Sequence, residues 1–410
     1  MSKATTILDR LRPSADWAKS SVFSRTRWKK VRFGDVVDNL NETCDPKDAG
    51  LERFIGLEHL EPGSLHVHTW GNVADGVTFN RRCRPGQVLF GKRRAYQRKV
   101  AVAEFDAVVS GDIYVLAPRG DRLLPELLPF ICLSERFFQH AVGTSAGSLS
   151  PRTNWSSLAS FEFELPVVDQ QQRLAEMLWT IDDVTESYLN AARACAGWVS
   201  AFSEHRCLDG RFRRVRLEVI LKAITAGKSV VGVNEPACDG ERGVLKVSAV
   251  GPRGFDPAEN KRLLNRSEFV PTLSVKAGDF LITRCNTKEL VGRVCIAPED
   301  HPSLMLCDKT LKLDFDEQAI APAYMEAVLK SREVRAQIEA FASGTGGAMK
   351  NISQDHIRSL LVPLPELAAQ QALVMELQHG LESHARLEAA AESATSLQFA
   401  ITNELMGIRV

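Results

Sequence analysis

An internal duplication is the feature of this 410-residue chain that most restricts its fold. The clearest matching segments are SFEFELPVVDQQQRLAEML (160–178) and SLLVPLPELAAQQALVMEL (359–377). Each is an alternating apolar stretch that is followed by Leu-Pro and by a glutamine-rich helix start. Gln171 lies five residues after Pro166, and Gln370 lies five residues after Pro365. A chain built in this way folds as two related units rather than as one large core.

Three further pairs of segments match in the same order along the chain. They are GTSAGSLS (143–150) with GTGGAMKN (344–351), PGQVLFGKRR (85–94) with AGDFLITRCN (277–286), and LEHL (57–60) with VSAV (247–250). Each match is weak alone, but four matches in one order indicate a duplication with small insertions.

Each copy combines a globular part with a helical part. Short β-like runs bounded by glycine or proline, such as VLFG (88–91) and IYVLAP (113–118), alternate with one helix per copy, so we expect α/β (α+β) domains. The helices are LPELLPFICLSERFFQHAVG and PAYMEAVLKSREVRAQIEAFASG. The predicted parts are an N-terminal segment (1–27), a first domain (28–165), a first helix (166–206), a second domain (213–364) and a second helix (365–406).

The helical parts show coiled-coil periodicity. In the first, one row recurs every seven residues (Leu174, Ile181, Tyr188, Cys195, Phe202) and a second row lies three residues further on (Met177, Val184, Ala191, Trp198). The second helix has a looser seam: Leu373, Leu377, Leu381, His384, Leu387, Ala391, Ala394, Ile401 and Leu405. We expect two antiparallel helices, each on the order of 60 Å long, that separate the two domains. The alternative is that each helix packs only on its own domain.

Charge is segregated along the chain although the formal net charge is zero. Residues 81–99 contain eight basic side chains and no acidic one, whereas 162–190 and 366–404 are rich in carboxylates. This distribution suits a protein that meets a polyanion with some segments only. The nine cysteines include no C-x-x-C pair and are expected to be reduced thiols. No apolar stretch approaches the roughly 18 residues of a membrane span, so we expect a cytoplasmic protein.

Along nearly its whole length the chain resembles the specificity subunits of type I restriction-modification enzymes. The residues that carry the resemblance are GQVLFGKRRAYQRKVAVAEFDAVVSGDIYVLAP (86–118), GTSAGSLS, and LPVVDQQQRLAEMLWTID leading into the first long helix. The resemblance implies two target-recognition domains, each reading half of a bipartite site in double-stranded DNA. It also implies a helical spacer that sets the gap between the half-sites, with the two copies related by a pseudo-twofold axis.

The same resemblance implies a non-catalytic chain that works within a phage-defence complex. Its expected partners are two methyltransferase subunits, together with restriction/translocase subunits. S-adenosylmethionine, ATP and Mg are then expected on the partners, with no cofactor and no metal on this chain. The sequence agrees, since it has no Asn-Pro-Pro-aromatic run and no glycine-rich cofactor loop.

Candidate DNA contacts cluster in the first domain. Lys and Arg neutralise phosphates, and Arg also forms two parallel hydrogen bonds to guanine. We assign most cations of the basic run to phosphates, and we take Arg93, Arg94 and Gln97 as the candidates for base edges. The alternative is a solvated basic loop. The candidates in this domain are Arg81, Arg82, Lys92, Arg93, Arg94, Tyr96, Gln97, Arg98, Lys99, Arg152 and Asn154.

The second domain offers fewer cations at wider spacing, which leaves open whether both domains grip DNA equally. Its candidates are Arg284, Asn286, Lys288, Arg293 and Lys350. The polar segments 148–158 and 346–357 precede the final strand of each copy, where they either contact DNA or simply cap the next helical turn.

Three other patterns point away from this function but are weak. AITAGKS (223–229) ends like a phosphate-binding loop, yet Lys222 stands where its first glycine is required. Asp256, Glu259 and Lys261 have the residue types of a metal-dependent nuclease, but their spacing is too tight. His66 and His68 have no nearby third zinc ligand. The remaining alternatives are therefore a coiled-coil adaptor that does not read DNA and, less favoured, a stand-alone nuclease.

Overall fold

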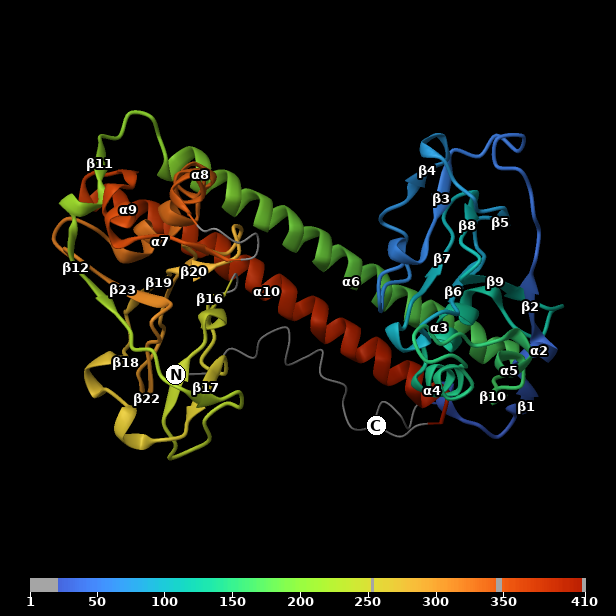
Figure 1. The fold of residues 1–410 in the computed structure, drawn as a ribbon. Helices are drawn as coiled ribbons and strands as arrows, with labels where there is room; N and C mark the ends of the chain where they lie inside the picture. Colours follow the sequence, from blue (N-terminus) through green and yellow to red (C-terminus); the bar gives the residue numbers. More distant parts are fainter. Residues whose placement is uncertain (1–20, 252–253, 344–348, 408–410) are drawn as a thin grey trace. The chain divides into compact units, whose positions relative to one another are not determined.

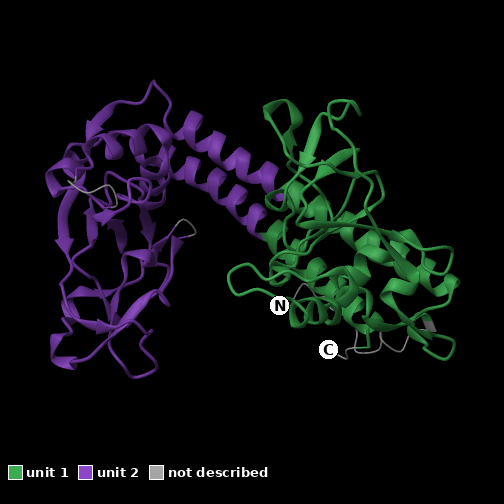
Figure 2. Ribbon diagram, turned by 45° about the vertical axis from the view of Figure 1, so that its right-hand side comes forward, with its two compact units in different colours: residues 1–191, 386–410 green, residues 192–385 purple. Residues whose placement is uncertain are grey.

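The computed structural model describes residues 21–251, 254–343 and 349–407. These residues belong to two compact units, which Figure 2 separates by colour: unit 1 contains residues 1–191 and 386–410, and unit 2 contains residues 192–385. Most of the predicted N-terminal segment 1–27, and residues 344–348 of the second GTGGAMKN segment, lie outside the described residues. Both long helices begin in one unit and end in the other.

Two sheets organise unit 1 (Figure 1). One has the strand order β2-β9-β6-β7, and the other has the order β4-β3-β8-β5, in which only β3 and β8 run parallel. A separate pair joins β1 to β10. The strands are β1 (Lys29–Arg32), β2 (Val37–Leu40), β3 (Arg53–Ile55), β4 (Gly71–Asn72), β5 (Arg81–Cys83), β6 (Val88–Gly91), β7 (Val100–Val102), β8 (Ala107–Val109), β9 (Ile113–Pro118) and β10 (Glu162–Leu165).

The β2-β9-β6-β7 sheet is buried on both faces. Val88 and Phe90 pack into one apolar cluster with the helices, whereas Leu89, between them in sequence, packs into a second cluster with Ile55 and Ala107. Successive side chains of a strand point to opposite faces, so a strand buried on both faces reads as a continuous apolar run. This explains why the runs VLFG and IYVLAP are apolar throughout.

The helix predicted in each globular part is in fact two helices. In unit 1, α3 (Leu128–Leu133) ends at Ser134, whose extended backbone starts α4 (Glu135–Gly143) and whose hydroxyl accepts a hydrogen bond from the Phe137 amide. Ser331 divides α7 (Pro322–Lys330) from α8 (Arg332–Phe341) in the same way. The prediction of one helix was wrong because a serine that caps a helix interrupts the helix before it without disturbing the apolar pattern. Unit 1 also contains α2 (Phe33–Val36) and α5 (Trp155–Ala159).

Unit 2 repeats this topology. Its sheet β12-β23-β19-β21 corresponds to β2-β9-β6-β7, and its five-stranded sheet β13-β17-β14-β22-β18 again contains one parallel pair, β14 with β22. The strands are β11 (Arg214–Arg216), β12 (Leu221–Ala226), β13 (Gly232–Val233), β14 (Gly243–Leu245), β15 (Val250–Gly251), β16 (Gly254–Phe255), β17 (Asn260–Leu263), β18 (Ser274–Val275), β19 (Phe280–Thr283), β20 (Cys285–Asn286), β21 (Val294–Ile296), β22 (His301–Met305), β23 (Thr310–Phe315), β24 (Lys350–Asn351) and β25 (Leu361–Pro363). A short helix, α9 (Gln354–Ser359), precedes β25.

A buried glutamine fixes the start of each long helix to its unit. In α6 (Val168–Phe202), Gln171 is 1% exposed; its Nε2 donates to the Pro166 and Arg122 carbonyls at 2.8 Å, and its Oε1 accepts from the Leu124 amide at 2.9 Å. In α10 (Leu367–Leu405), Gln370 makes the corresponding three bonds, to Pro365, Ala319 and Ala321. The Pro-to-Gln spacing that revealed the duplication is thus a structural clamp.

The buried stripe of α6 is rotated from the predicted seam. Of the predicted rows, Leu174 and Phe202 are buried, but Val184 and Trp198 are 40% and 46% exposed. The buried row lies one position further on, at Leu178, Thr185 and Ala192. The prediction was wrong for the second row because the true stripe contains polar residues. Their side chains are hydrogen-bonded, so they pack inside without contributing to an apolar pattern.

The seam of α10 follows its prediction more closely. Leu373, Leu377, Ala391, Ala394, Ile401 and Leu405 are buried. Leu381 is 50% exposed, and the buried Gly380 takes its place in the row. A side chain at Gly380 would come within 2.4 Å of the Trp198 ring, so only glycine lets the indole of α6 lie there. Within the described residues, no helix combines the length and apolar character that a membrane span requires.

Asp182 links α6 to a loop of unit 1. This carboxylate is 5% exposed and accepts from the Gln398 amide at 3.0 Å and from His66 Nε2 at 2.8 Å. His66 Nδ1 lies 2.8 Å from Glu104. The hydrogen bond to Asp182 raises the pKa of His66 to about 9, against the opposing effect of burial. His66 therefore serves as a charged strut between loop and helix, in keeping with the expectation that it is not a zinc ligand.

Replacing Gln171 tests the clamp. Gln171→Ala removes three hydrogen bonds and leaves the partly buried Leu124 amide unpaired, so we expect the free energy of unfolding of unit 1 to fall by about 3 kcal/mol. Denaturant unfolding measures this change. The matched control is Gln172→Ala, because the exposed Gln172 side chain donates to Glu176 on the surface of the same helix. Equal effects of the two substitutions would contradict the clamp.

The ion pair between His66 and Asp182 makes the stability of unit 1 depend on pH. Because the folded pKa is raised above the ordinary value of 6.5, the contribution is fully present below pH 6.5 and is lost as the pH rises through about 9. We expect the stability difference between wild type and His66→Gln to be on the order of 2 kcal/mol at pH 6 and to shrink by pH 10. Denaturant unfolding at both pH values checks this, and a difference that does not change with pH would refute it.

Candidate nucleic-acid interface

The basic run of unit 1 begins in β5, and its second part, residues 92–99, forms the tight connection between β6 and β7. A 3-10 turn, η5 (Ala95–Gln97), lies at its tip between Arg94 (φ 53°) and Arg98 (φ 56°). Left-handed backbone costs about 1–2 kcal/mol for a residue with a side chain. The Arg94 amide donates to the Pro151 carbonyl at 2.7 Å, and Ala95 is buried, so surrounding contacts hold the turn. The result is that Tyr96 projects from the tip, 56% exposed.

Asp112 is the acidic centre of this surface. Arg152 Nε lies 2.8 Å from Asp112 Oδ1, and Arg93 Nη1 lies 3.2 Å from Oδ2. Arg93 also donates to the Ser150 hydroxyl at 3.0 Å, and Arg94 does so at 3.4 Å. Burial works to raise the pKa of Asp112, but the hydrogen bonds from Arg152 and Arg93 outweigh it and hold the pKa below its usual value. One carboxylate therefore fixes the orientation of two guanidinium groups.

Acidic residues outside the run pair with other cations of the run. Arg82 makes two bonds to Asp106, at 2.9 and 2.6 Å, and Arg98 pairs with Glu135. Arg81 Nη1 donates to the Ile113 carbonyl at 3.0 Å, and Lys99 Nζ donates to the Leu57 carbonyl at 2.7 Å. These side-chain contacts hold the cations in defined positions on the surface of unit 1.

Lys92 and Asn154 complete the predicted set in unit 1. The Lys92 ammonium lies 4.9 Å from the centre of the Tyr114 ring, and burial lowers its pKa. Asn154 Oδ1 accepts from the Ser157 amide at 2.8 Å and so caps α5, which agrees with the capping role left open for this segment. The Asn154 oxygen is thus already engaged.

An open hollow brings several predicted residues together. It has a volume of about 350 Å³ and is lined by Arg93, Arg94, Gln97 and Lys99, with Leu57, Glu58, Ser110 and Asp112 opposite. The candidates for base edges therefore share one concave surface with a lysine. Sequence reasoning missed Asp112 and Ser150. Asp106 and Asp112 follow the basic run closely in sequence, so this nearby acidity was the available signal for the pairs that they form.

The predicted DNA contacts of unit 2 do not all lie on one surface. β20 pairs with β24, which places Asn286 opposite Lys350, and the side chains of Arg284 and Lys288 are exposed nearby in sequence. Arg293 lines a different hollow, with Gly251, Lys330 and Arg335. The β20–β24 pair corresponds to the isolated bridge between Arg93 and Arg152 in unit 1.

Backbone hydrogen bonds show which residues correspond in the two units. In unit 1, the Lys92 amide donates to Asp112, and the Thr153 amide donates to Lys92. In unit 2, the Arg284 amide donates to Lys309, and the Ile352 amide donates to Arg284. Lys309 therefore occupies the place of Asp112, so unit 2 cannot fix its cations with the same carboxylate.

The carboxylates Asp256 and Glu259, which have the residue types of a nuclease, do not converge on a metal site. Asp256 Oδ1 accepts from the Ala258 amide at 3.0 Å, and Glu259 accepts from the Ser248 hydroxyl, so the two carboxylates serve separate local bonds. Within residues 21–251, 254–343 and 349–407, no group of three or more His, Cys, Asp or Glu side chains is placed to hold a metal ion.

Comparison with known proteins gives relatives in one class. No protein-family model matches the chain. The type I restriction enzyme EcoEI specificity subunit of Escherichia coli is 29% identical over 191 residues, which are 46% of this chain and 32% of that protein. The EcoDI specificity subunit of Escherichia coli is 27% identical over 179 residues, 41% of this chain and 38% of that protein. The matches thus span about a third of the length of these relatives.

Solved structures show the same fold. The type I restriction-modification system S subunit from M. genitalium superposes with a TM-score of 0.58 at 11% identity, covering 94% of this chain and 97% of that chain. A chain from a type I R-M system, solved to explain complex assembly and conformational transition, gives a TM-score of 0.56 at 16% identity, covering 92% and 97%. In sequence and in fold, the chain is therefore related to the specificity subunits of type I restriction-modification systems.

Proposed function

We propose that this chain is a non-catalytic specificity subunit that reads a bipartite site in double-stranded DNA for a type I restriction-modification complex. The observation that carries the proposal is the repetition of one architecture in both units. Each unit has the same sheet order, the same glutamine clamp and a cation-bearing connection at the same point. Two copies of one reading domain match a site with two halves.

The hollow around Asp112 supports base reading by unit 1. A guanidinium group that is already oriented by a carboxylate loses little entropy when it binds a base edge. Arg93 and Arg152 are 37% and 52% exposed while they contact Asp112, so each can still meet a ligand. Tyr96 and Gln97 add an exposed ring and an amide beside them. We assign base contacts to this group and phosphate contacts to the surrounding lysines.

The long helices support a spacer function. Asp182 of α6 bonds to Gln398 of α10 within unit 1, and Cys195 of α6 bonds to Gly380 of α10 within unit 2. Residue numbers therefore rise along α6 as they fall along α10, as in an antiparallel pair. We propose that this pair sets the unread gap between the half-sites and relates the units by a pseudo-twofold axis.

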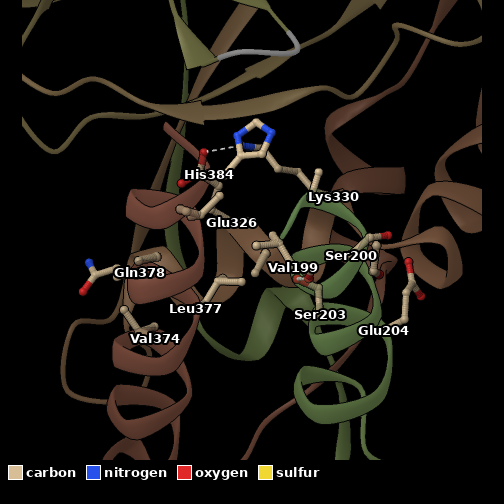
Figure 3. A pocket seen from close by; sticks show the side chains of 15 residues that line it. Val199, Ser200, Ser203, Glu204, Glu326, Lys330, Val374, Leu377, Gln378 and His384 are labelled. Carbon is tan, nitrogen blue, oxygen red and sulfur yellow. Dashed lines mark hydrogen bonds and ion pairs between the residues drawn. The ribbon is translucent and has the colours of Figure 1, made fainter. Parts of the chain in front are cut away.

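Two grooves beside the long helices support the proposal that the chain has two similar surfaces for partner subunits. In unit 2, α6, α7 and α10 line a groove of about 450 Å³, in which Val199 of α6 and Leu377 of α10 lie near each other (Figure 3). In unit 1, a smaller groove of about 240 Å³ is lined by Thr395, Gln398, Phe399 and Thr402. These positions of α10 lie 199 residues after Ala196, Val199, Ser200 and Ser203, which line the groove of unit 2. We propose that each groove receives one methyltransferase subunit. S-adenosylmethionine, ATP and Mg would then bind to the partner subunits, and the complex would work in the cytoplasm.

Genome-wide methylation mapping tests the function. The chain is expressed with its methyltransferase subunit in a host that lacks adenine methylation, and modified adenines are mapped by long-read sequencing. We expect one split motif with a fixed unread gap. An unmethylated genome, with the complex intact, would favour the adaptor alternative, and metal-dependent cutting by the purified chain would favour the nuclease.

Asp112→Asn tests base reading by unit 1. Loss of the carboxylate frees Arg93 and Arg152, so we expect discrimination against wrong bases in one half-site to fall about tenfold, as an oriented arginine contributes on the order of 1–3 kcal/mol. The same methylation map, compared with that of the control Asp121→Asn on an exposed loop, measures this change. Unchanged selectivity at both half-sites would count against the assignment.

A further inference from the structure

A lysine-lined hollow of unit 2 lies outside the set of candidate DNA contacts that were predicted for the second domain. It has a volume of about 400 Å³, and three lysines line it: Lys246 after β14, Lys261 in β17 and Lys309 before β23. Ser229, Ser248 and Asp308 lie on the same surface. The side chains of Lys261 and Lys309 are exposed, whereas the Lys246 ammonium lies 3.8 Å from Glu259.

This hollow occupies the same place in the repeat as the Asp112 hollow of unit 1. Its wall contains Val247 and Ser248, which correspond to Leu57 and Glu58 in the LEHL and VSAV match. The backbone bonds described above equate Lys309 with Asp112. The position that the duplication makes equivalent to the reading surface of unit 1 is thus hollow in both units.

The charge of the two hollows differs at their corresponding positions. Where unit 1 has Glu58 and Asp112, unit 2 has Ser248 and Lys309. The arginines of unit 1 are held by a carboxylate. The exposed ammonium groups of Lys261 and Lys309 instead lie in a hollow that has no acid at the positions of Glu58 and Asp112. Ammonium groups are compact point charges that bind phosphate without selecting a base.

The adjoining AGKS loop (226–229) does not form a nucleotide cradle. The Gly227 amide donates to the Thr310 carbonyl at 3.4 Å, and the Lys228 amide donates to the Leu306 carbonyl at 3.1 Å. A Cβ at Gly227 would lie 2.2 Å from the Cys307 carbonyl oxygen, so this glycine serves close packing against the chain before β23. Because these amides are engaged, side chains rather than backbone amides must provide the contacts to a ligand.

We propose that Lys246, Lys261 and Lys309 hold the phosphate backbone of duplex DNA at the second half-site. The proposal rests on the function proposed above and assigns its second DNA surface to lysines that are not among the candidate DNA contacts of the second domain. Arg284, which donates its amide to Lys309, adjoins this surface and connects it to the predicted set. Unit 1 then orients arginines for base edges, and these lysines of unit 2 contribute salt-dependent affinity.

Salt dependence of binding tests the proposal. The full chain, assembled with its methyltransferase subunit, is titrated with a duplex that carries the motif found by methylation mapping. Each neutralised phosphate contributes about 0.9 to the slope of log K against log salt. We expect Lys261→Gln with Lys309→Gln to lower this slope by about 2 and to weaken binding at least tenfold. The control Lys276→Gln, at an exposed lysine of unit 2 outside the hollow, leaves both unchanged.

A second measurement uses the unaltered protein. The assembled complex is acetylated with and without the duplex, and lysine modification is read by mass spectrometry. We expect the duplex to protect Lys261 and Lys309 but not Lys276. Equal modification of Lys261 with and without DNA, or protection by single-stranded RNA alone, would overturn the proposal. A split methylation motif combined with an unchanged salt slope would overturn this assignment while leaving the proposed function standing.

Discussion

The rest of the structure depends on a buried glutamine amide that fixes the start of each long helix. Gln171 and Gln370 each use both donor and acceptor, bonding to the preceding proline carbonyl and to a loop that leads into α3 or α7. A primary amide can satisfy several buried backbone groups at once, which no apolar side chain can do. Each globular part is thereby locked to its helix in the same way.

Charge pairing organises the surface that we assign to DNA. A run of cations without an acid in sequence becomes, in three dimensions, a set of arginines held by Asp106, Asp112 and Glu135. Exposed ion pairs stabilise a fold little, so their main consequence here is orientation. The two units differ at the centre of this surface, where Asp112 corresponds to Lys309. The duplication has therefore kept the scaffold while changing the chemistry placed on it.

The long helices show how far an apolar pattern can be trusted. The seam of α10 was predicted well because its buried positions are mostly Leu, Ile and Ala. In α6 only the second row of the seam was predicted one position away, because the polar residues Asp182 and Thr185 are buried along the helix. Asp182 can be buried along this helix because its carboxylate accepts hydrogen bonds from His66 and Gln398. These partners come from distant parts of the sequence, so periodicity alone could not place the stripe.

The sequence by itself determined the duplication, the mixed α/β character of each globular part, the two long helices and the first basic connection. These features depend on local patterns: repeated segments, alternating apolar runs, heptads and a dense run of like charge. Only the tertiary structure decided that Ser134 and Ser331 divide a helix, that Asp112 orients Arg93 and Arg152, and that Lys309 takes the place of Asp112 in unit 2. The physical reason is that a capping serine leaves the apolar pattern of the flanking helices unchanged, and that the charge contacts join separate segments of the chain whose spacing in sequence does not specify which side chains meet.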